Sequence, residues 1–409
     1  MSRPGRLLSI NSYHYRRGGA DVVYLETDAM FRNAGWDTAV MSMRHPSNLP
    51  SEWSEFFVDE LELNQSNGLL DKLRKASKVV YSFEAQRRLE ALLARFGPDI
   101  AHLHNIYHHL SPSVLPALSR HGIPAVLTAH DLKIACPAYK MLNSEGICER
   151  CRTGSVAQVV MHRCIHDSYA ASAIVAIESA LQRQRSLYRR HLAKVICPSR
   201  FYVDKLREWG WPAEQLSWVP NAIDSTPFDG PIEIGDYFLF AGRLSPEKGV
   251  LTLVEAARRA GVPLRIAGTG PAQDLLRAHA QGHDIVFPGF VGGEALWSLI
   301  RGARALVLPS EWYENAPMSI LEAFACGTPV IGADIGGIPE LIEPGVDGLL
   351  FRSGDADSLA DALASVAAMS PATLRAMGEA GRDRVRRDHA PQRYFDGVLQ
   401  VYRSVGFAH

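Results

Sequence analysis

Short apolar runs of strand-like character alternate with segments of helical period along the whole chain. This alternation is the pattern of α/β layers built on parallel sheets. It passes through two cycles, separated by a stretch without periodicity. The apolar runs are residues 7–12, 38–43, 100–104, 125–129, 194–197 and 216–219 in the first cycle, and 237–241, 264–267, 285–287, 305–308 and 329–331 in the second. The sequence therefore predicts an α/β fold of two doubly wound, Rossmann-like parallel-sheet domains.

The break between the cycles falls in residues 221–235, which are rich in Pro, Gly and Asp. We expect one domain over residues 1–222 and a second over residues 223–389, facing each other across a central cleft. A chain of 409 residues is long enough for two such domains. Ligands of such sheets bind beyond the carboxyl ends of the strands.

The charge balance argues against a dedicated nucleic-acid binder, since 43 Lys and Arg face 44 Asp and Glu. The balance is uneven, because residues 1–222 carry 27 basic and 21 acidic side chains, and residues 223–409 carry 16 and 23. Two basic segments of helical period, 69–80 and 181–194, are typical of solvated helix faces or of peripheral contact with an anionic membrane.

No apolar run approaches the ~20 residues of a membrane span, and the short run after Arg6 is too brief for a secretory signal. We therefore expect a cytoplasmic protein, with the inner face of the plasma membrane as the surface that its basic half would touch. Nothing in the sequence indicates an oligomeric state.

The most informative stretch is PSEWYENAPMSILEAFACGTPVI at residues 309–331. Pro317 suits the first position of a helix, which leaves the amides of Met318 and Ser319 unpaired. Free amides at the positive end of a helix dipole favour phosphate. Glu322 follows about one turn later, within reach of ribose hydroxyls, while Glu314 stays on the loop. The alternative is that Glu314 caps the helix and Glu322 is solvated.

A second cluster of functional side chains is FAGRLSPEKG at residues 240–249. Arg243 and Lys248 lie five residues apart on a loop after a strand, and such a pair suits a diphosphate group. The alternative is an ordinary loop with solvated cations. Gly18 and Gly19 follow the first strand, where they permit a close approach to a bulky ligand or form a simple turn.

These motifs together resemble the retaining glycosyltransferases of family 4, which have the GT-B fold. The resemblance covers nearly the whole chain. It is carried by Gly18 and Gly19, HLHN at 102–105, His130, CPSRF at 197–201, VPNAID at 219–224, GRLSPEKG at 242–249, AGTGP at 267–271, and the pair Glu314 and Glu322. It implies transfer of a sugar from a nucleoside-diphosphate sugar to an acceptor hydroxyl, with the anomeric configuration kept. Residues 1–222 would bind the acceptor, residues 223–389 the donor, and a helix at about 390–408 would pack back on the first domain.

The resemblance also implies roles for single residues. Arg243 and Lys248 would hold the diphosphate, Glu322 the ribose, and Glu314 with Asn315 and the amides of Met318 and Ser319 the donor sugar. Gly18 and Gly19 would close over the phosphates, and His130 would line the reacting face. Because cations and helix amides can neutralise the leaving diphosphate, no catalytic metal is expected.

The resemblance to this family favours a role in bacterial exopolysaccharide, capsule or O-antigen assembly, on a glycan or lipid-linked acceptor. The alternatives are transfer to a small soluble metabolite, and a nucleotide-sugar-binding module without turnover. AGTGP lacks the last glycine of a dinucleotide fingerprint, which argues against a nicotinamide cofactor.

Four cysteines lie within an insertion at residues 136–164, spaced C-x11-C-x2-C-x12-C: Cys136, Cys148, Cys151 and Cys164. This spacing fits tetrahedral Zn²⁺, with His162 and His166 as substitutes for one thiolate. Four thiolates leave no open position, so the zinc would be structural. Free thiols are the alternative, and disulfides are disfavoured in a reducing compartment. His102 and His104 lie two residues apart on one face of a predicted strand. We expect them to pack at the end of this strand and to contact the acceptor rather than to bind a metal.

Overall fold

The computed structural model describes residues 4–61, 77–107 and 109–407. The chain forms two compact units. Unit 1 comprises Met1–Pro198, Tyr202–Val219 and Phe395–His409, and unit 2 comprises Ser199–Phe201 and Pro220–Tyr394.

Unit 1 is built on a six-stranded sheet whose strands are all parallel, in the order β2-β1-β3-β4-β7-β8. The strands are β1 (Arg6–Ile10), β2 (Asp37–Met41), β3 (Ile100–Leu103), β4 (Ala125–Thr128), β7 (Lys194–Cys197) and β8 (Leu216–Trp218). The central strands are apolar and buried at almost every position, because helices cover both faces of a parallel sheet. The helices are α1 (Gly19–Asn33), η1 (Ser54–Phe56), α3 (Phe83–Phe96), α4 (Val114–Arg120), α7 (Tyr169–Arg185), α8 (Leu187–His191), α9 (Arg200–Glu208) and η2 (Ala213–Gln215).

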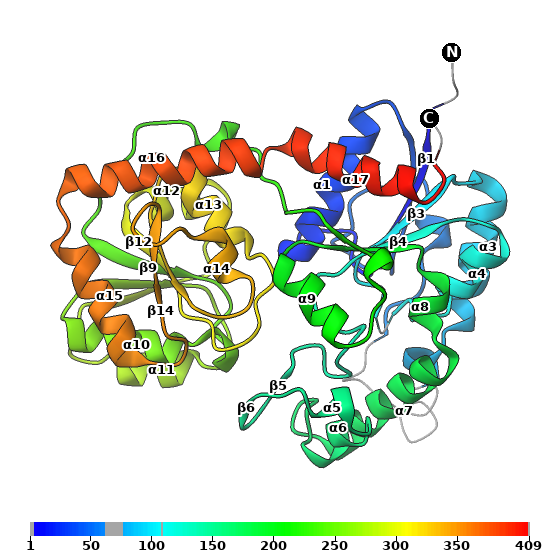
Figure 1. Cartoon of the computed structure of the whole chain (residues 1–409), viewed down its shortest axis with the longest axis horizontal. Helices are drawn as coiled ribbons and strands as arrows, with labels where there is room; N and C mark the ends of the chain where they lie inside the picture. Colours follow the sequence, from blue (N-terminus) through cyan, green and yellow to red (C-terminus); the bar gives the residue numbers. More distant parts are fainter. Residues whose placement is uncertain (1–3, 62–76, 108, 408–409) are drawn as a thin grey trace. The chain divides into compact units, whose positions relative to one another are not determined.

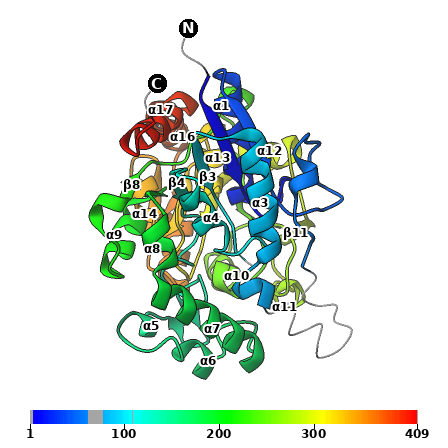
Figure 2. The same ribbon diagram turned by 90° about the vertical axis from the view of Figure 1, so that its right-hand side faces the viewer.

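The cysteine-bearing insertion has little regular structure. It contains β5 (Leu142–Asn143), β6 (Gly146–Ile147), α5 (Arg150–Thr153) and α6 (Gln158–Met161). In both Figure 1 and Figure 2, α5 and α6 lie beside α7, away from the strands of the unit 1 sheet.

Unit 2 repeats the architecture with a parallel sheet in the order β11-β10-β9-β12-β13-β14. Its strands are β9 (Tyr237–Ala241), β10 (Leu264–Ala267), β11 (Ile285–Gly289), β12 (Ala303–Leu308), β13 (Val330–Ala333) and β14 (Gly348–Phe351). Its helices are η3 (Thr226–Phe228), η4 (Pro246–Lys248), α10 (Val250–Ala260), α11 (Gln273–His279), α12 (Glu294–Arg301), α13 (Met318–Cys326), α14 (Ile338–Leu341), α15 (Ala356–Ala368) and α16 (Pro371–Asp388), with α17 (Pro391–Ser404) following. In Figure 1, α10, α11 and α15 lie on one side of this sheet and α12, α13 and α16 on the other.

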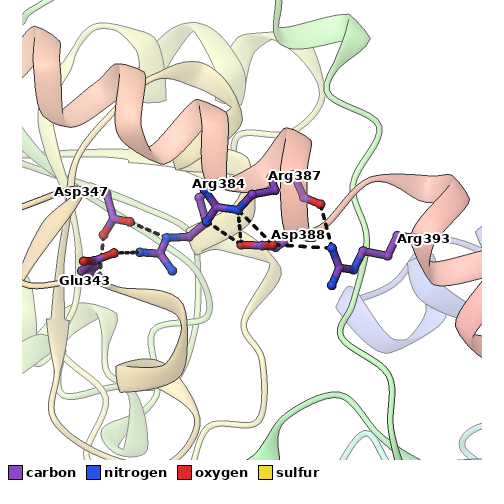
Figure 3. A network of polar contacts seen from close by, with 6 residues as sticks. All are labelled: Glu343, Asp347, Arg384, Arg387, Asp388 and Arg393. Atoms are coloured by element: carbon purple, nitrogen blue, oxygen red, sulfur yellow. Dashed lines mark hydrogen bonds and ion pairs between the residues drawn. The ribbon is translucent and has the colours of Figure 1, made fainter.

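An ion-pair network fixes the end of α16 (Figure 3). The guanidinium of Arg384 donates to the carboxylate of Asp347 at 2.5 Å and to that of Glu343 at 2.8 Å. At the junction with α17, Asp388 lies 3.7 Å from Arg393. Asp347 is fully buried, so the network ties the loop before β14 to the helix that ends unit 2.

The second half of α17 belongs to unit 1. The ring of Phe395 lies 4.8 Å from that of Phe31 on α1, and the Tyr402 hydroxyl is 2.7 Å from Nδ1 of His102 on β3. Tyr402 is fully buried, so α17 contributes to the core of unit 1.

Three details of the sequence prediction were wrong or incomplete. Strand β14 was not predicted, since its four residues follow a glycine-rich turn and carry no alternation. Pro317 is the residue before α13 rather than its first, with an extended ψ of 122°. The basic segment 181–194 is not one helix, because Ser186 adopts a left-handed conformation between α7 and α8. Most of the other basic segment, 69–80, lies outside the described residues.

Candidate active site

The carboxyl ends of β9, β12 and β13 meet at one edge of the unit 2 sheet, because these strands are parallel neighbours. The loop after β9 carries Arg243 and Lys248, and the loop after β12 carries Glu314 and Asn315. Residues predicted to bind one ligand therefore come to the same edge of the sheet, where ligands of such folds bind.

Glycines hold the loops at this edge in close contact. Gly249 has a φ of +64°, and a Cβ there would lie 1.8 Å from the carbonyl oxygen of Pro309. The amide of Glu311 also donates to the Glu247 carbonyl at 2.9 Å. A Cβ on Gly268 would lie 1.8 Å from the Gly242 oxygen. Gly268 belongs to the AGTGP motif, so this motif serves close packing of two loops.

The centre of the site is the carboxylate of Glu314, whose residue is only 6% exposed. Three donors converge on its Oε1: Lys248 Nζ at 2.7 Å, the Ser310 hydroxyl at 2.7 Å, and the Trp312 indole N–H at 2.8 Å. The Lys248 ammonium also lies 5.2 Å from the centre of the Trp312 ring. The carboxylate is thus neutralised and cannot rotate freely.

The main chain around Glu314 is fixed by a glycine pair after β13. The amide of Gly337 donates to the Glu314 carbonyl at 2.8 Å. A Cβ on Gly337 would lie 1.8 Å from the carbonyl oxygen of Asn315, and Gly336 has a φ of +62°. The Asn315 side chain pairs with the Ser199 hydroxyl at 2.8 Å, and Asn221 donates to the Ala316 carbonyl at 3.0 Å. Ser199 and Asn221, from the CPSRF and VPNAID motifs, therefore position this loop.

Arg243 and the first amides of α13 lack hydrogen-bond partners within the described residues, so they are available to a ligand. Arg243 is exposed, and within the described residues its guanidinium makes no hydrogen bond or ion pair. Pro317 provides no side-chain cap for α13, so within the described part of the chain the amides of Met318 and Ser319 have no side-chain capping partner. Glu322 is half-buried one turn further along α13. A cation and uncapped helix amides can together receive a phosphate.

Sequence reasoning missed Ser310, Trp312, Gly336 and Gly337 as parts of the site. Ser310 and Trp312 stand four and two residues before Glu314, in the same stretch that was singled out. Their side chains can donate hydrogen bonds, which is the signal that could have found them. Gly336 and Gly337 act through contacts of their backbone, so no side-chain pattern in the sequence could have indicated their role.

In unit 1, His130 follows β4 and belongs to a column of stacked imidazoles. His102 on β3 and His104, the residue directly after β3, stack with ring centres 4.4 Å apart, and His104 and His130 with centres 5.1 Å apart. His104 Nδ1 lies 2.9 Å from His130 Nε2, so one ring donates to the other. His102 pairs with Thr128 through Nε2 at 2.7 Å. The predicted packing of His102 and His104 at the end of the strand is confirmed, and their contact with the acceptor stays a prediction.

Burial sets the protonation of this column. It lowers the pKa of His102 to about 3 and that of His130 to about 4, and lowers that of His104 well below its ordinary value. These imidazoles are therefore neutral near pH 7. The neighbouring carboxyl of Asp131 has its pKa raised by burial to about 6. His130 thus offers a neutral ring that can accept or donate one hydrogen bond.

Gly18 and Gly19 lie exposed at the start of α1. Gly18 is the residue before the helix, with extended backbone, and its carbonyl accepts from Asp21 and Val22 at 3.0 Å. Neither glycine has a left-handed φ, so the backbone does not require glycine at either position.

The four insertion cysteines are free thiols. Burial raises the pKa of Cys136 and of Cys164 to about 11 and also raises that of Cys151, with a further rise from neighbouring thiols of the same set. Each of these three pKa values is therefore affected by at least one other thiol of the set. Among the residues that the structure describes, no group of three or more His, Cys, Asp or Glu side chains could hold a metal ion as it stands. The zinc site stays a prediction.

Known proteins match both halves of the chain. The model of Glycosyltransferase Family 4 matches residues 17–226, and that of Glycosyl transferases group 1 matches residues 227–384. A glycogen synthase of Mycobacterium tuberculosis is 31% identical over 301 residues, 68% of each chain. The putative colanic acid biosynthesis glycosyltransferase WcaL of Salmonella typhimurium is 30% identical over 216 residues, 47% of this chain and 52% of that protein. The Anabaena protein HepE, solved with UDP and glucose, superposes with a TM-score of 0.67 over 98% of this chain and 100% of its own, at 17% identity.

Two parallel-sheet units with these structural neighbours define an α/β protein of the GT-B fold. The chain belongs to the group 1 and family 4 glycosyltransferases. None of the helices in the described ranges is long and apolar enough to cross a membrane.

Proposed function

We propose that the protein transfers a sugar from a nucleoside-diphosphate sugar to an acceptor hydroxyl with retention of the anomeric configuration. The observation that carries this proposal is the edge of the unit 2 sheet, where a buried carboxylate, a lysine, an open arginine and an uncapped helix start come together. Arg243 and Lys248 would bind the diphosphate. Glu322 would bind the ribose. Glu314 with Asn315 and the amides of Met318 and Ser319 would bind the sugar.

Lys248 can serve two groups at once under this proposal. Its ammonium has three donors, and one of them is engaged by Glu314 at 2.7 Å. The others remain for a phosphate oxygen, so the leaving diphosphate and the sugar-binding carboxylate would be held by the same cation. Arg243 and the amides of α13 would add to the stabilisation of the leaving group, and we expect that no catalytic metal is needed.

We propose a front-face route, in which the leaving phosphate helps to take the acceptor proton and His130 lines the reacting face. Glu314 is poorly suited to act as a nucleophile, because three donors on its Oε1, one of them the Lys248 ammonium, stabilise the negative charge of the carboxylate. Gly18 and Gly19 would close over the phosphates. Trapping of a kinetically competent covalent glycosyl–Glu314 intermediate would refute this route.

A panel of UDP-, GDP-, ADP- and TDP-sugars tests donor binding by thermal shift. A donor at ~100 Kd adds about 2.7 kcal/mol of stability, so one member should raise the midpoint clearly. UDP-glucose is the first choice, because HepE was solved with UDP and glucose. A flat response to the whole panel would contradict the proposal.

The biological role we propose is bacterial exopolysaccharide, capsule or O-antigen assembly on a glycan or lipid-linked acceptor. It is supported by the similarity to WcaL, whose name assigns it to colanic acid biosynthesis. Transfer to a small soluble metabolite is the alternative. Contact with an anionic membrane through the basic half, at the inner face of the plasma membrane, belongs to the same proposal. Pelleting with vesicles that is independent of anionic lipid and of salt would contradict its electrostatic form.

We also propose that Cys136, Cys148, Cys151 and Cys164 hold one structural Zn²⁺. The spacing of the four cysteines along the sequence supports this, and binding would draw the thiols together with release of protons. Protein purified without added zinc should contain about one ion per chain. Cys148→Ser should lose the metal, whereas Cys326→Ser, a change in the core of unit 2, should keep it. A zinc content near zero would refute the proposal.

A further inference from the structure

A second concave site lies entirely within unit 1. It is a pocket of about 250 Å³, bounded by the cysteine-bearing insertion, α7, α8 and the turn after α9. Arg152, Arg183 and Arg189 line it together with Tyr188, Trp209 and Trp211. None of the residues assigned to sugar transfer above lines this pocket, so their function does not account for it.

The pocket has an excess of positive charge. Its lining includes three arginines and Lys133 but no Asp or Glu. Lys133 forms a buried ion pair with Glu178 at 2.8 Å, and Arg152 forms an ion pair with Glu208 at 3.5 Å. Within the described part of the chain, the guanidinium groups of Arg183 and Arg189 have no carboxylate partner. Two cations that face one small pocket therefore lack a counter-charge.

The same two guanidiniums are held in fixed orientations by main-chain oxygens. Arg183 donates to the carbonyls of Cys151 at 3.0 Å and Ala135 at 3.2 Å. Arg189 donates to the carbonyl of Trp209 at 2.8 Å. A guanidinium has five N–H groups, so donors remain on each. Because the side chains are already ordered, a ligand would not have to meet the cost of ordering them.

Aromatic rings form the apolar part of the lining. The guanidinium carbon of Arg183 lies 5.9 Å from the centre of the Trp209 ring, and that of Arg189 lies 5.8 Å from the centre of the Trp211 ring. The indole N–H of Trp211 points to the Ile134 carbonyl at 3.4 Å, so this ring offers its apolar surface to the pocket. Tyr188 adds a buried hydroxyl for which the described residues supply no hydrogen-bond partner.

We propose that this pocket binds a compact phosphate-bearing ligand, with the phosphate between Arg183 and Arg189 and its uncharged part against Trp209 and Trp211. Planar guanidinium forks match phosphate oxygens, and the paired rings give an apolar wall beside them. The volume is below the range typical of sites for drug-sized ligands, which favours a group the size of a sugar phosphate or a lipid diphosphate head. The binding itself does not depend on the proposed sugar transfer.

Calorimetry on the full chain tests the proposal with inorganic phosphate, glucose 1-phosphate, geranyl diphosphate and, as the uncharged control, glucose. The titrations are made in an Arg243→Gln background, so that the proposed donor site does not contribute. We expect at least one phosphate-bearing probe to bind and glucose not to bind. Tighter binding of geranyl diphosphate would indicate a lipid-linked source, and tighter binding of glucose 1-phosphate a soluble one.

Matched variants locate the binding. Arg183→Gln and Arg189→Gln should each weaken it about tenfold or more, since each removes charge-assisted hydrogen bonds. Arg185→Gln and Arg190→Gln remove the same charge from α7 and α8 outside the pocket lining and should leave the affinity unchanged. Because Arg183 also holds the insertion, the Arg189 variant decides if the Arg183 variant folds poorly. The proposal is overturned if no phosphate-bearing probe binds, or if Arg189→Gln and Arg190→Gln have equal effects.

Discussion

Two buried tyrosine hydroxyls of unit 1 differ in whether the protein gives them a partner. The Tyr402 hydroxyl lies 2.7 Å from His102 Nδ1, at the end of the imidazole column. The Tyr188 hydroxyl is equally buried and has no partner in the described part of the chain. Removing a hydroxyl is costly only where it leaves another buried polar atom without its hydrogen bond.

We therefore expect the replacement of tyrosine by phenylalanine to have different effects on stability at these two positions. Tyr402→Phe leaves His102 Nδ1 without a partner and should lower the free energy of unfolding by about 1–3 kcal/mol. Tyr188→Phe should leave it unchanged or raise it slightly. Denaturant titration of the two variants against the parent chain measures both. Equal destabilisation would contradict the distinction between a paired hydroxyl on Tyr402 and an unpaired one on Tyr188.

Single residues of the candidate active site should separate binding from turnover. Lys248→Ala should reduce both donor affinity and turnover, because the proposed diphosphate contact and the charge that balances Glu314 are lost together. Glu322→Gln should chiefly raise the KM for the donor, since an amide accepts hydrogen bonds from the ribose hydroxyls less strongly than a carboxylate does. Steady-state kinetics on the donor found by thermal shift give both constants. Glu379→Gln, an exposed change on α16, is the control, and unchanged kinetics in the first two variants would remove the site assignment.

At the scale of elements, helix α10 carries a glycine at each end, and the two differ only in their surroundings. Gly249 and Gly261 both have a φ of +64°. A Cβ on Gly249 would lie 1.8 Å from the Pro309 oxygen, whereas a Cβ on Gly261 would meet no atom within 4 Å. The first glycine joins the loops after β9 and β12, and the second only ends the helix.

Alanine at these two positions should separate the cost of backbone conformation from the cost of loop contact. Gly261→Ala should destabilise by about 1 kcal/mol, the cost of a left-handed alanine. Gly249→Ala should cost clearly more and also weaken donor binding, because Pro309 and the loop leading to Glu314 must move. Unfolding curves and the thermal shift with donor test both. Equal effects of the two changes would show that the contact between the loops does not matter.

The sequence predicted the elements better than their contacts. Apolar runs such as 237–241 and 305–308 mark strands because both faces of a parallel sheet are buried. Strand β14 was missed, since a short run after a turn carries no period. Lys248 and Glu314 were both predicted to bind the donor, but their direct pairing joins residues 66 apart, and spacing along the chain cannot show it. Likewise, the stacking of His130 on His104 depends on the pairing of β3 with β4.

At the scale of the whole molecule, buried neutral imidazoles make stability depend on pH. Burial lowers the pKa of His14 and of His130 to about 4 and that of His102 to about 3, and His104 is lowered as well. In the unfolded chain these groups titrate near 6.5. Unfolding therefore takes up protons below that pH, and stability that is present above pH 6.5 is lost as the pH falls. Asp131 opposes the trend, because its raised pKa favours folding as the pH falls through about 6.

We expect the free energy of unfolding to fall by on the order of 4 kcal/mol between pH 7.5 and pH 5.5. Each of the four histidines lowers it by about 1.4 kcal/mol over this range, whereas Asp131 raises it by less than that amount. Denaturant titrations at both pH values, followed by a signal from unit 1, measure this loss. His102→Gln should make this loss smaller by about 1.4 kcal/mol, about a third of it, because one of the four titrating histidines is gone. His121→Gln, an exposed change, should leave it as it is. A stability that is flat or rises toward pH 5.5 would mean that the imidazole column is protonated in the folded protein, and with it His130.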